Sequence, residues 1–120
     1  VMLITLLPTL ALSLALTLIL EGLFALLWGV RSRRDYLLLL AANALTNPAV
    51  VLFHCLVSDS AAAVAVSEVL AVLAEAALYR RFGSEKLRPA LLFSLCANVF
   101  SFCCGLLLNI VVFKLSTAPY

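Results

Sequence analysis

Three glutamates and four asparagines lie inside the apolar stretches of this 120-residue sequence, where polar side chains are rare and mark functional sites. Six of these seven residues fall nearest the middle of the stretches: Glu21, Asn43, Asn47, Glu68, Glu75 and Asn98. Carboxylate and amide oxygens are hard ligands that suit Na⁺, H⁺, Mg²⁺ or an amine better than a soft metal. The six side chains are therefore predicted to form a binding site for a cation or a small cationic solute.

Asn43 and Asn47 share one face of the second apolar stretch, because they are four residues apart. Pro48 follows directly and has no backbone N–H, so the carbonyl of Ala44 loses its helical partner and a kink is predicted over residues 44–47. Freed carbonyls beside amides can coordinate a cation or a polar group of a substrate. The alternative interpretation is a kinked helix whose amides bind only the neighbouring helices.

The glutamates lie well inside the apolar stretches. At helical rise, Glu21 is about 15 Å from Arg31 and Glu68 is about 18 Å from Arg80. Glu75 is only about 8 Å from Arg80, so it is expected to pair with the arginines there. Because Glu21 and Glu68 are too far from any loop for such pairing, they are predicted to hold the charge of the ligand.

The composition identifies the elements that carry these groups. The chain is 66% hydrophobic and 12% charged, whereas a soluble domain is roughly half apolar and a quarter charged. A membrane-spanning helix needs about 20 apolar residues. The spans are predicted at about 2–30, 36–57, 61–82 and 89–113. We therefore predict an all-α polytopic membrane protein, with four transmembrane helices in a single domain over residues 1–120.

The basic residues are distributed unequally between the predicted loops. Seven of the eight lysines and arginines lie in or beside loops 31–35 and 83–88, whereas the loop around Asp59 has none. The positive-inside rule places the basic loops in the cytoplasm. We predict a multi-pass protein of the cell's inner (plasma) membrane with both termini outside. Its basic loops are expected to contact anionic lipid headgroups and not nucleic acid.

The sole histidine and most of the large polar aromatic residues fall near the ends of the spans. His54 is about 30 Å from the basic end of its helix, so an interfacial histidine is predicted. A single histidine is weak evidence for a metal, and no metal is assigned. Trp28, Tyr36, Tyr79 and Tyr120 are predicted to form an aromatic belt at the membrane surfaces.

The two halves of the sequence resemble each other. Each half has a glutamate, seven residues, a glycine, a basic loop, an apolar run, Ala-Asn, two residues, and a threonine or serine. Both basic loops fall on one side, so the halves are interpreted as parallel repeats related by a pseudo-two-fold axis along the membrane normal. Two helical hairpins then form a four-helix bundle, in which Glu21 and Asn43 lie opposite Glu75 and Asn98.

Two long segments resemble small bacterial integral membrane proteins that have four spans and a Thr-Asn-Pro motif on the second. The segments are LEGLFALLWGVRSRRDYLLLLAANALTNP and EAALYRRFG…RPALLFSLCANVFSFCCGLLL. The resemblance covers most of the chain and implies the fold and the membrane location, but no binding residue. Asn47 and Pro48 have no counterpart in the second half, which carries Phe102 and Cys103 there. They are therefore predicted to be closer to the function than Asn43.

These features favour a small transporter or channel subunit for a cation or small cationic solute. Four spans are few for a transporter, so a homodimer or a larger membrane complex is expected, surrounded by membrane lipids. The alternative is a non-transporting structural or regulatory subunit of a larger membrane complex, whose polar face binds neighbouring helices. An enzyme is not predicted, because motifs such as G-x-S-x-G and H-E-x-x-H are absent from the sequence. No cofactor is predicted.

Overall fold

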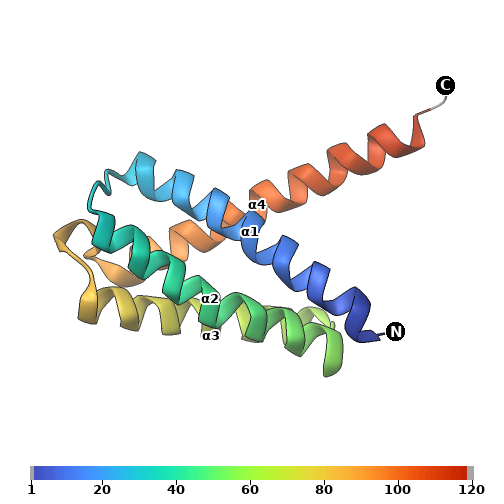
Figure 1. The fold of residues 1–120 in the computed structure, drawn as a ribbon, viewed down its shortest axis with the longest axis horizontal. Coiled ribbons are helices and arrows are strands. Elements are labelled where there is room, and N and C mark those ends of the chain that lie inside the picture. The colour runs from blue at the N-terminus through green and yellow to red at the C-terminus, as the bar shows by residue number, and fades with distance from the viewer. Residues whose placement is uncertain (1, 119–120) are drawn as a thin grey trace.

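The computed structural model describes residues 2–118, and the side chains of residues 4–118. Its long helices are α1 (Met2–Trp28), α2 (Arg33–Leu56), α3 (Ala61–Phe82) and α4 (Ala90–Thr117), and the short 3₁₀ helix η1 (Glu85–Leu87) precedes α4 (Figure 1). Each long helix has the length and the apolar composition that are needed to cross a membrane. The protein is therefore an all-α polytopic membrane protein, as its composition predicts.

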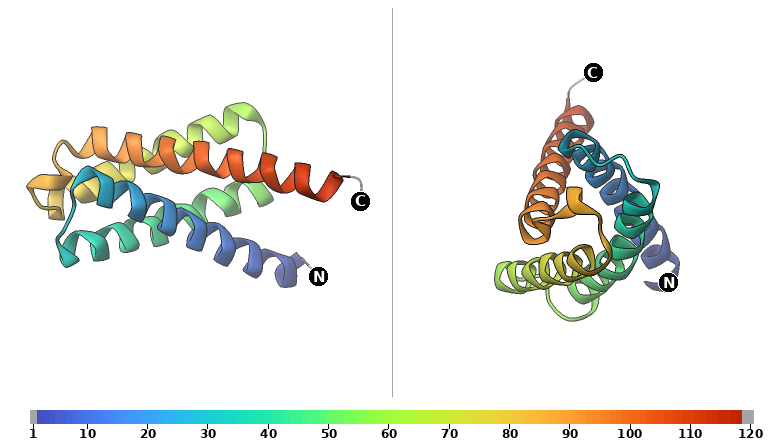
Figure 2. Two further views of the ribbon diagram at one scale, coloured as in Figure 1. Left: turned by 90° about the horizontal axis from the view of Figure 1, so that it is seen from above. Right: turned by 90° about the vertical axis from the view of Figure 1, so that its left-hand side faces the viewer.

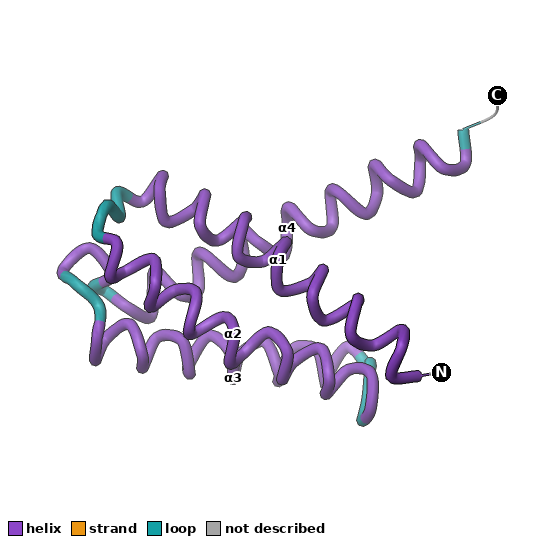
Figure 3. Tube along the Cα trace, in the orientation of Figure 1, coloured by secondary structure: helices purple, strands orange, loops and turns teal. Residues whose placement is uncertain are grey.

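The four long helices contact one another in a closed ring, in which α1 touches α2, α2 touches α3, α3 touches α4, and α4 touches α1. The α1–α2 and α3–α4 loops lie together at one end, which we call the basic end (Figures 1 and 3). The α2–α3 loop lies at the opposite end with both ends of the chain, and we call this the terminal end. Toward the terminal end α1 and α4 diverge (Figure 1), and the side chains of residues 106–117 are all exposed.

The fully buried apolar side chains gather in the half of the bundle nearest the basic end. Tyr79 and Phe93 are both 0% exposed, and their ring centroids are 5.4 Å apart. Trp28 packs edge-on against Phe93 at 5.5 Å. The prediction that Tyr79 belongs to an aromatic belt is therefore wrong, because its ring points into the bundle. Tyr120 lies outside the described residues.

The boundaries differ from the predicted spans at the basic end. Arg33, Arg34 and Asp35 form the first turn of α2 and are not part of a loop. An acidic side chain in a first turn is favourable beside the free N–H groups of the helix. The loop between α3 and α4 contains η1, and α4 continues to Thr117. The described helices otherwise follow the four apolar stretches.

Two hydrogen-bonded contacts join the loops at the basic end. The buried carboxylate of Asp35 accepts hydrogen bonds from the backbone N–H of Ser84, at 3.0 Å, and from its hydroxyl. The indole N–H of Trp28 donates to the carbonyl of Lys86 at 2.9 Å. The view from above and the end-on view in Figure 2 show how α1 and α2 are brought against α3 and α4 at this end. The end is thus closed by specific contacts as well as by apolar packing.

Asp35→Ala is expected to lower the free energy of unfolding by about 1–3 kcal/mol, because the backbone N–H and the hydroxyl of Ser84 both lose their charged acceptor. The measurement is unfolding of the purified protein in detergent micelles, followed by its helical circular dichroism. Asp59→Ala is the matched control, since Asp59 is exposed in the α2–α3 loop. Equal effects of the two substitutions would show that the Asp35 contact does not stabilise the bundle.

Candidate binding site

Glu75 forms the contact at which α2, α3 and α4 meet. Its Oε1 accepts a hydrogen bond from Thr46 at 2.7 Å. Its Oε2 accepts one from Asn98 Nδ2 at 2.7 Å and a longer one from Ser94 at 3.3 Å. The prediction that Glu75 pairs with the arginines is wrong, because its side chain is buried in the bundle while the arginines of the last turn of α3 are exposed.

Glu21 and Asn43 form a contact of the same kind between α1 and α2. Asn43 Nδ2 donates to Glu21 Oε2 at 2.7 Å and to the carbonyl of Leu39 at 3.0 Å. Asn98 also donates to the carbonyl four residues before it, that of Ser94, at 2.8 Å. Each asparagine therefore joins its own helix to a glutamate of the preceding helix.

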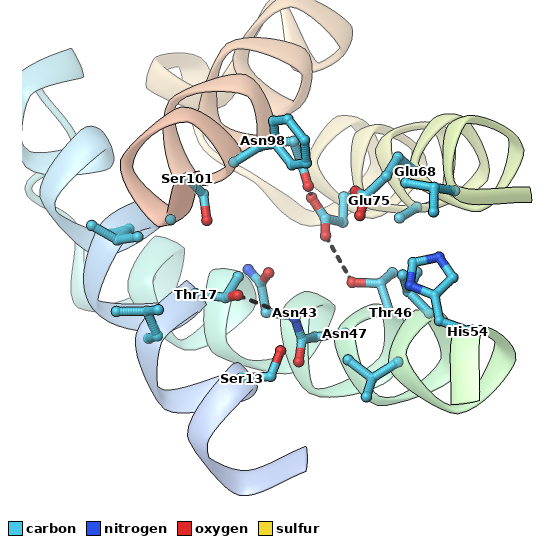
Figure 4. A pocket seen from close by; sticks show the side chains of 18 of the residues that line it. Ser13, Thr17, Asn43, Thr46, Asn47, His54, Glu68, Glu75, Asn98 and Ser101 are labelled. Carbon is cyan, nitrogen blue, oxygen red and sulfur yellow. Dashed lines mark hydrogen bonds between the residues drawn. The ribbon is translucent and has the colours of Figure 1, made fainter. Parts of the chain in front are cut away.

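A cavity of about 470 Å³ lies between the four helices, beside these contacts and toward the terminal end (Figure 4). Its volume is within the range of about 300–1,000 Å³ that is typical of small-molecule sites. The polar side chains that line it are Ser13, Thr17, Asn43, Thr46, Asn47, His54, Glu68, Glu75, Asn98, Ser101 and Asn109. All four long helices contribute to this list, so the site exists only in the assembled bundle.

Five of the six predicted binding residues line this cavity, and one does not. The five are Asn43, Asn47, Glu68, Glu75 and Asn98. Glu21 is 0% exposed and is joined to the cavity wall only through its hydrogen bond with Asn43. Its depth in the bundle fits the prediction, but its carboxylate faces a helix–helix contact and not the open space.

Glu68 is the carboxylate that faces the cavity without a hydrogen bond from any described residue. It is half-buried on α3, and Figure 4 shows its side chain beside Glu75 and across from His54. By contrast, both oxygens of Glu75 have donors. Glu68 is therefore the carboxylate that is available to a ligand.

His54 lies on the cavity wall, half-buried and within electrostatic range of Glu68. Its Nε2 is 2.8 Å from the hydroxyl of Ser67, which itself donates to the carbonyl of Val64. This contact joins the last turn of α2 to α3. His54 is in the last turn of α2, so the interfacial histidine stays a prediction. Its spacing of seven from Asn47 puts both residues on one face, and both line the cavity.

Asn47 offers a second acceptor that has no partner. Its Nδ2 donates to Thr17 on α1 at 3.1 Å, while its buried Oδ1 has no hydrogen-bond partner among the described residues. The helix α2 runs through Pro48 without interruption. The kink over residues 44–47 stays a prediction, but the amide beside Pro48 does line the cavity.

The titratable groups in and beside the cavity are three glutamates and one histidine. Glu21, Glu68 and Glu75 lie within electrostatic range of one another, and no lysine or arginine is among the described residues that line the wall. Within residues 2–118, no group of three or more histidine, cysteine, aspartate or glutamate side chains is arranged to hold a metal ion. The surroundings therefore favour a positively charged group, held by few strong ligands.

The arrangement can bind a positive charge at Glu68, the carboxylate on the cavity wall that has no donor among the described residues. Hydroxyl and amide groups of α1, α2 and α4 complete a polar wall around this position. In comparisons with known proteins, no protein-family model, no curated protein and no solved structure significantly matches this chain.

Proposed function

We propose that the protein is a small transporter or channel subunit that binds a cation or a small cationic solute in the cavity between its four helices. The observation that carries this proposal is the carboxylate of Glu68, which faces the cavity without a hydrogen bond from any described residue. A carboxylate inside a membrane-spanning bundle is unfavourable unless it binds a proton or a cation. A cationic ligand supplies that partner.

A division of roles among the carboxylates supports the proposal. Glu21 and Glu75 each bind an asparagine and hold the helices together, whereas Glu68 faces the cavity. The two matched glutamate–asparagine contacts also support the interpretation that the bundle is built from two parallel repeats. The framework and the ligand-binding group are therefore distinct residues, and Glu68 and Glu75 are about 10 Å apart along α3.

The two ends of the bundle support a path that is open on one side. Toward the basic end, Tyr79 and Phe93 are fully buried and fill the space between the helices. Toward the terminal end, α1 and α4 diverge beside the cavity (Figure 1). With the basic end in the cytoplasm, as the positive-inside rule favours, the cavity faces the outside of an inner (plasma) membrane protein. Passage to the other side then requires the aromatic layer to move.

A homodimer or a larger membrane complex is part of this proposal. The exposed side chains of residues 106–117 are predominantly apolar and meet either lipid or a partner. Four spans enclose only a small polar path, so a second copy is expected to complete it. The basic loops then contact anionic headgroups, each basic residue contributing about 1 kcal/mol near the surface.

Glu68→Gln is expected to abolish cation-dependent charge movement, because the substitution removes the one carboxylate that has no donor among the described residues of the cavity wall. The loss of a charge-assisted contact corresponds to a decrease in affinity of about 10- to 100-fold. The measurement is the current across proteoliposomes after a concentration jump of NaCl, KCl, MgCl₂ or butylammonium chloride. Glu85→Gln is the matched control, since Glu85 is exposed in η1.

Two results of the current measurement would contradict the proposal. The first is a wild-type protein that carries no current with any of the four salts. The second is a Glu68→Gln variant that carries the same current as the wild type and the Glu85→Gln control. A current that is present in the wild type and the control, and absent in Glu68→Gln, supports it.

One observation favours the second candidate function, a non-transporting structural or regulatory subunit. Asn109 lines the cavity yet is exposed where α1 and α4 diverge, so a helix of a partner protein has room to bind there. In this case a Glu68→Cys variant, with the four native cysteines changed to alanine, reacts with a soluble maleimide only after the complex is dissociated. Equal reactivity in native membranes and after purification argues for the open cavity.

A further inference from the structure

We infer that the ligand of this cavity is an organic ammonium ion with an apolar body, and not a metal ion. The inference rests on the proposed function and names its class of solute. The first reason is the size of the cavity. Its volume of about 470 Å³ is within the range of about 300–1,000 Å³ that is typical of sites for small organic ligands. A dehydrated Na⁺ or Mg²⁺ ion instead needs a close cage of oxygens at about 2.0–2.6 Å.

The second reason is the number of free ligands. Glu68 is the one carboxylate on the cavity wall that lacks a donor among the described residues, because both oxygens of Glu75 are occupied. The Oδ1 atom of Asn47 also lacks a partner, but it is buried in the wall and has no surface that a ligand can contact. An alkylammonium group has three N–H donors at most, so the two oxygens of one carboxylate and a wall hydroxyl satisfy it. The same set leaves a metal ion under-coordinated.

The third reason is the apolar part of the wall. Val50 and Val51 of α2, Val64 of α3, and Phe102 and Leu106 of α4 line the cavity together with the polar groups. The side chains of Phe102 and Leu106 are 53% and 48% exposed, so they have surface that a ligand can cover. Burying apolar surface contributes roughly 25 cal/mol per Å² to the free energy of binding. An organic cation gains this contribution, whereas a bare metal ion has no apolar surface to bury.

Calorimetric titration of the protein in lipid nanodiscs tests this inference, with the heats of empty nanodiscs subtracted. The probes are phenethylammonium chloride, the neutral analogue 2-phenylethanol, KCl and MgCl₂. We expect saturable binding of phenethylammonium only, weakened about 10- to 100-fold in Glu68→Gln. Phe102→Ala is expected to weaken it several-fold. Phe113→Ala is the matched control, because Phe113 is also on α4 and exposed but does not line the cavity.

The possible results separate this inference from the proposed function. Binding of K⁺ or Mg²⁺ without binding of phenethylammonium, lost in Glu68→Gln, overturns the organic class and leaves the cation site in place. Equal binding of 2-phenylethanol and phenethylammonium overturns the role of charge. If no probe binds, the inference is also overturned. The proposed function is tested separately, by the current measurement in proteoliposomes. An equal loss in Phe102→Ala and Phe113→Ala removes the argument from the apolar wall.

Discussion

Glu75→Ala is expected to lower the free energy of unfolding by roughly 2–4 kcal/mol, the largest effect on stability of any substitution in the polar centre. The carboxylate accepts hydrogen bonds from Thr46, Asn98 and Ser94 and so joins three helices. Interhelical hydrogen bonds in membrane proteins contribute about 0.6 kcal/mol each on average. The remainder of the loss comes from the space that the truncated side chain leaves in a buried position.

The donors around Glu75 set the size of the effect. Thr46 is also within hydrogen-bond distance of the carbonyl of Ala42, at 3.1 Å, so its hydroxyl keeps a partner when the carboxylate is removed. Thr46→Val is therefore expected to cost less than Glu75→Ala, by about the value of one interhelical bond. Both are measured by titrating the purified protein from mild detergent into sodium dodecyl sulfate and following its circular dichroism.

Glu85→Ala is the control for this measurement, because Glu85 is exposed at the basic end and belongs to η1. It tests whether the loss of any one negative charge changes stability in detergent. If Glu75→Ala and Glu85→Ala unfold at the same denaturant fraction, the contact at Glu75 does not hold the bundle together. A larger loss for Glu75→Ala alone assigns the effect to the three-helix contact.

The four spans could be predicted from the sequence because a membrane-spanning helix requires a certain length and an apolar composition, and both are visible in the sequence. An apolar run of about 20 residues has few alternatives to a membrane-spanning helix. The depth of the polar residues could be predicted for the same reason, since each residue rises a fixed 1.5 Å along a helix. Five of the six predicted residues therefore line one cavity. The repeat stays a prediction, although the two glutamate–asparagine contacts have the same form.

The direction of each side chain around its helix could not be predicted in the same way. Glu75 is close to the arginines along the helix axis, but it faces the bundle while they face outward. Glu21 has the predicted depth and faces a helix–helix contact. His54 lies on the cavity wall and contacts Ser67 of α3, which depends on how α2 packs against α3. Such orientations depend on which helices become neighbours, and no single segment contains that information.

Gly105→Phe is expected to abolish binding of phenethylammonium and the cation current while the protein still folds. Gly105 lines the cavity, and a Cβ atom placed there would meet no heavy atom within 4 Å. The new ring therefore has room to enter the cavity and occupy the volume of the ligand. Replacing a helical glycine also favours the helix, by up to about 1 kcal/mol, so the thermal stability in detergent is expected to be unchanged or higher.

Gly22→Phe is the matched control, because a Cβ atom at Gly22 also meets nothing within 4 Å but Gly22 does not line the cavity. It introduces the same ring into α1 and is expected to bind ligand like the wild type. Normal binding by Gly105→Phe would mean that the ligand does not use this cavity. Glu68→Gln removes the charge and keeps the volume, whereas Gly105→Phe removes the volume and keeps the charge. If Glu68→Gln weakens binding, Gly105→Phe abolishes it and Gly22→Phe leaves it unchanged, the site requires both the carboxylate and the space beside it.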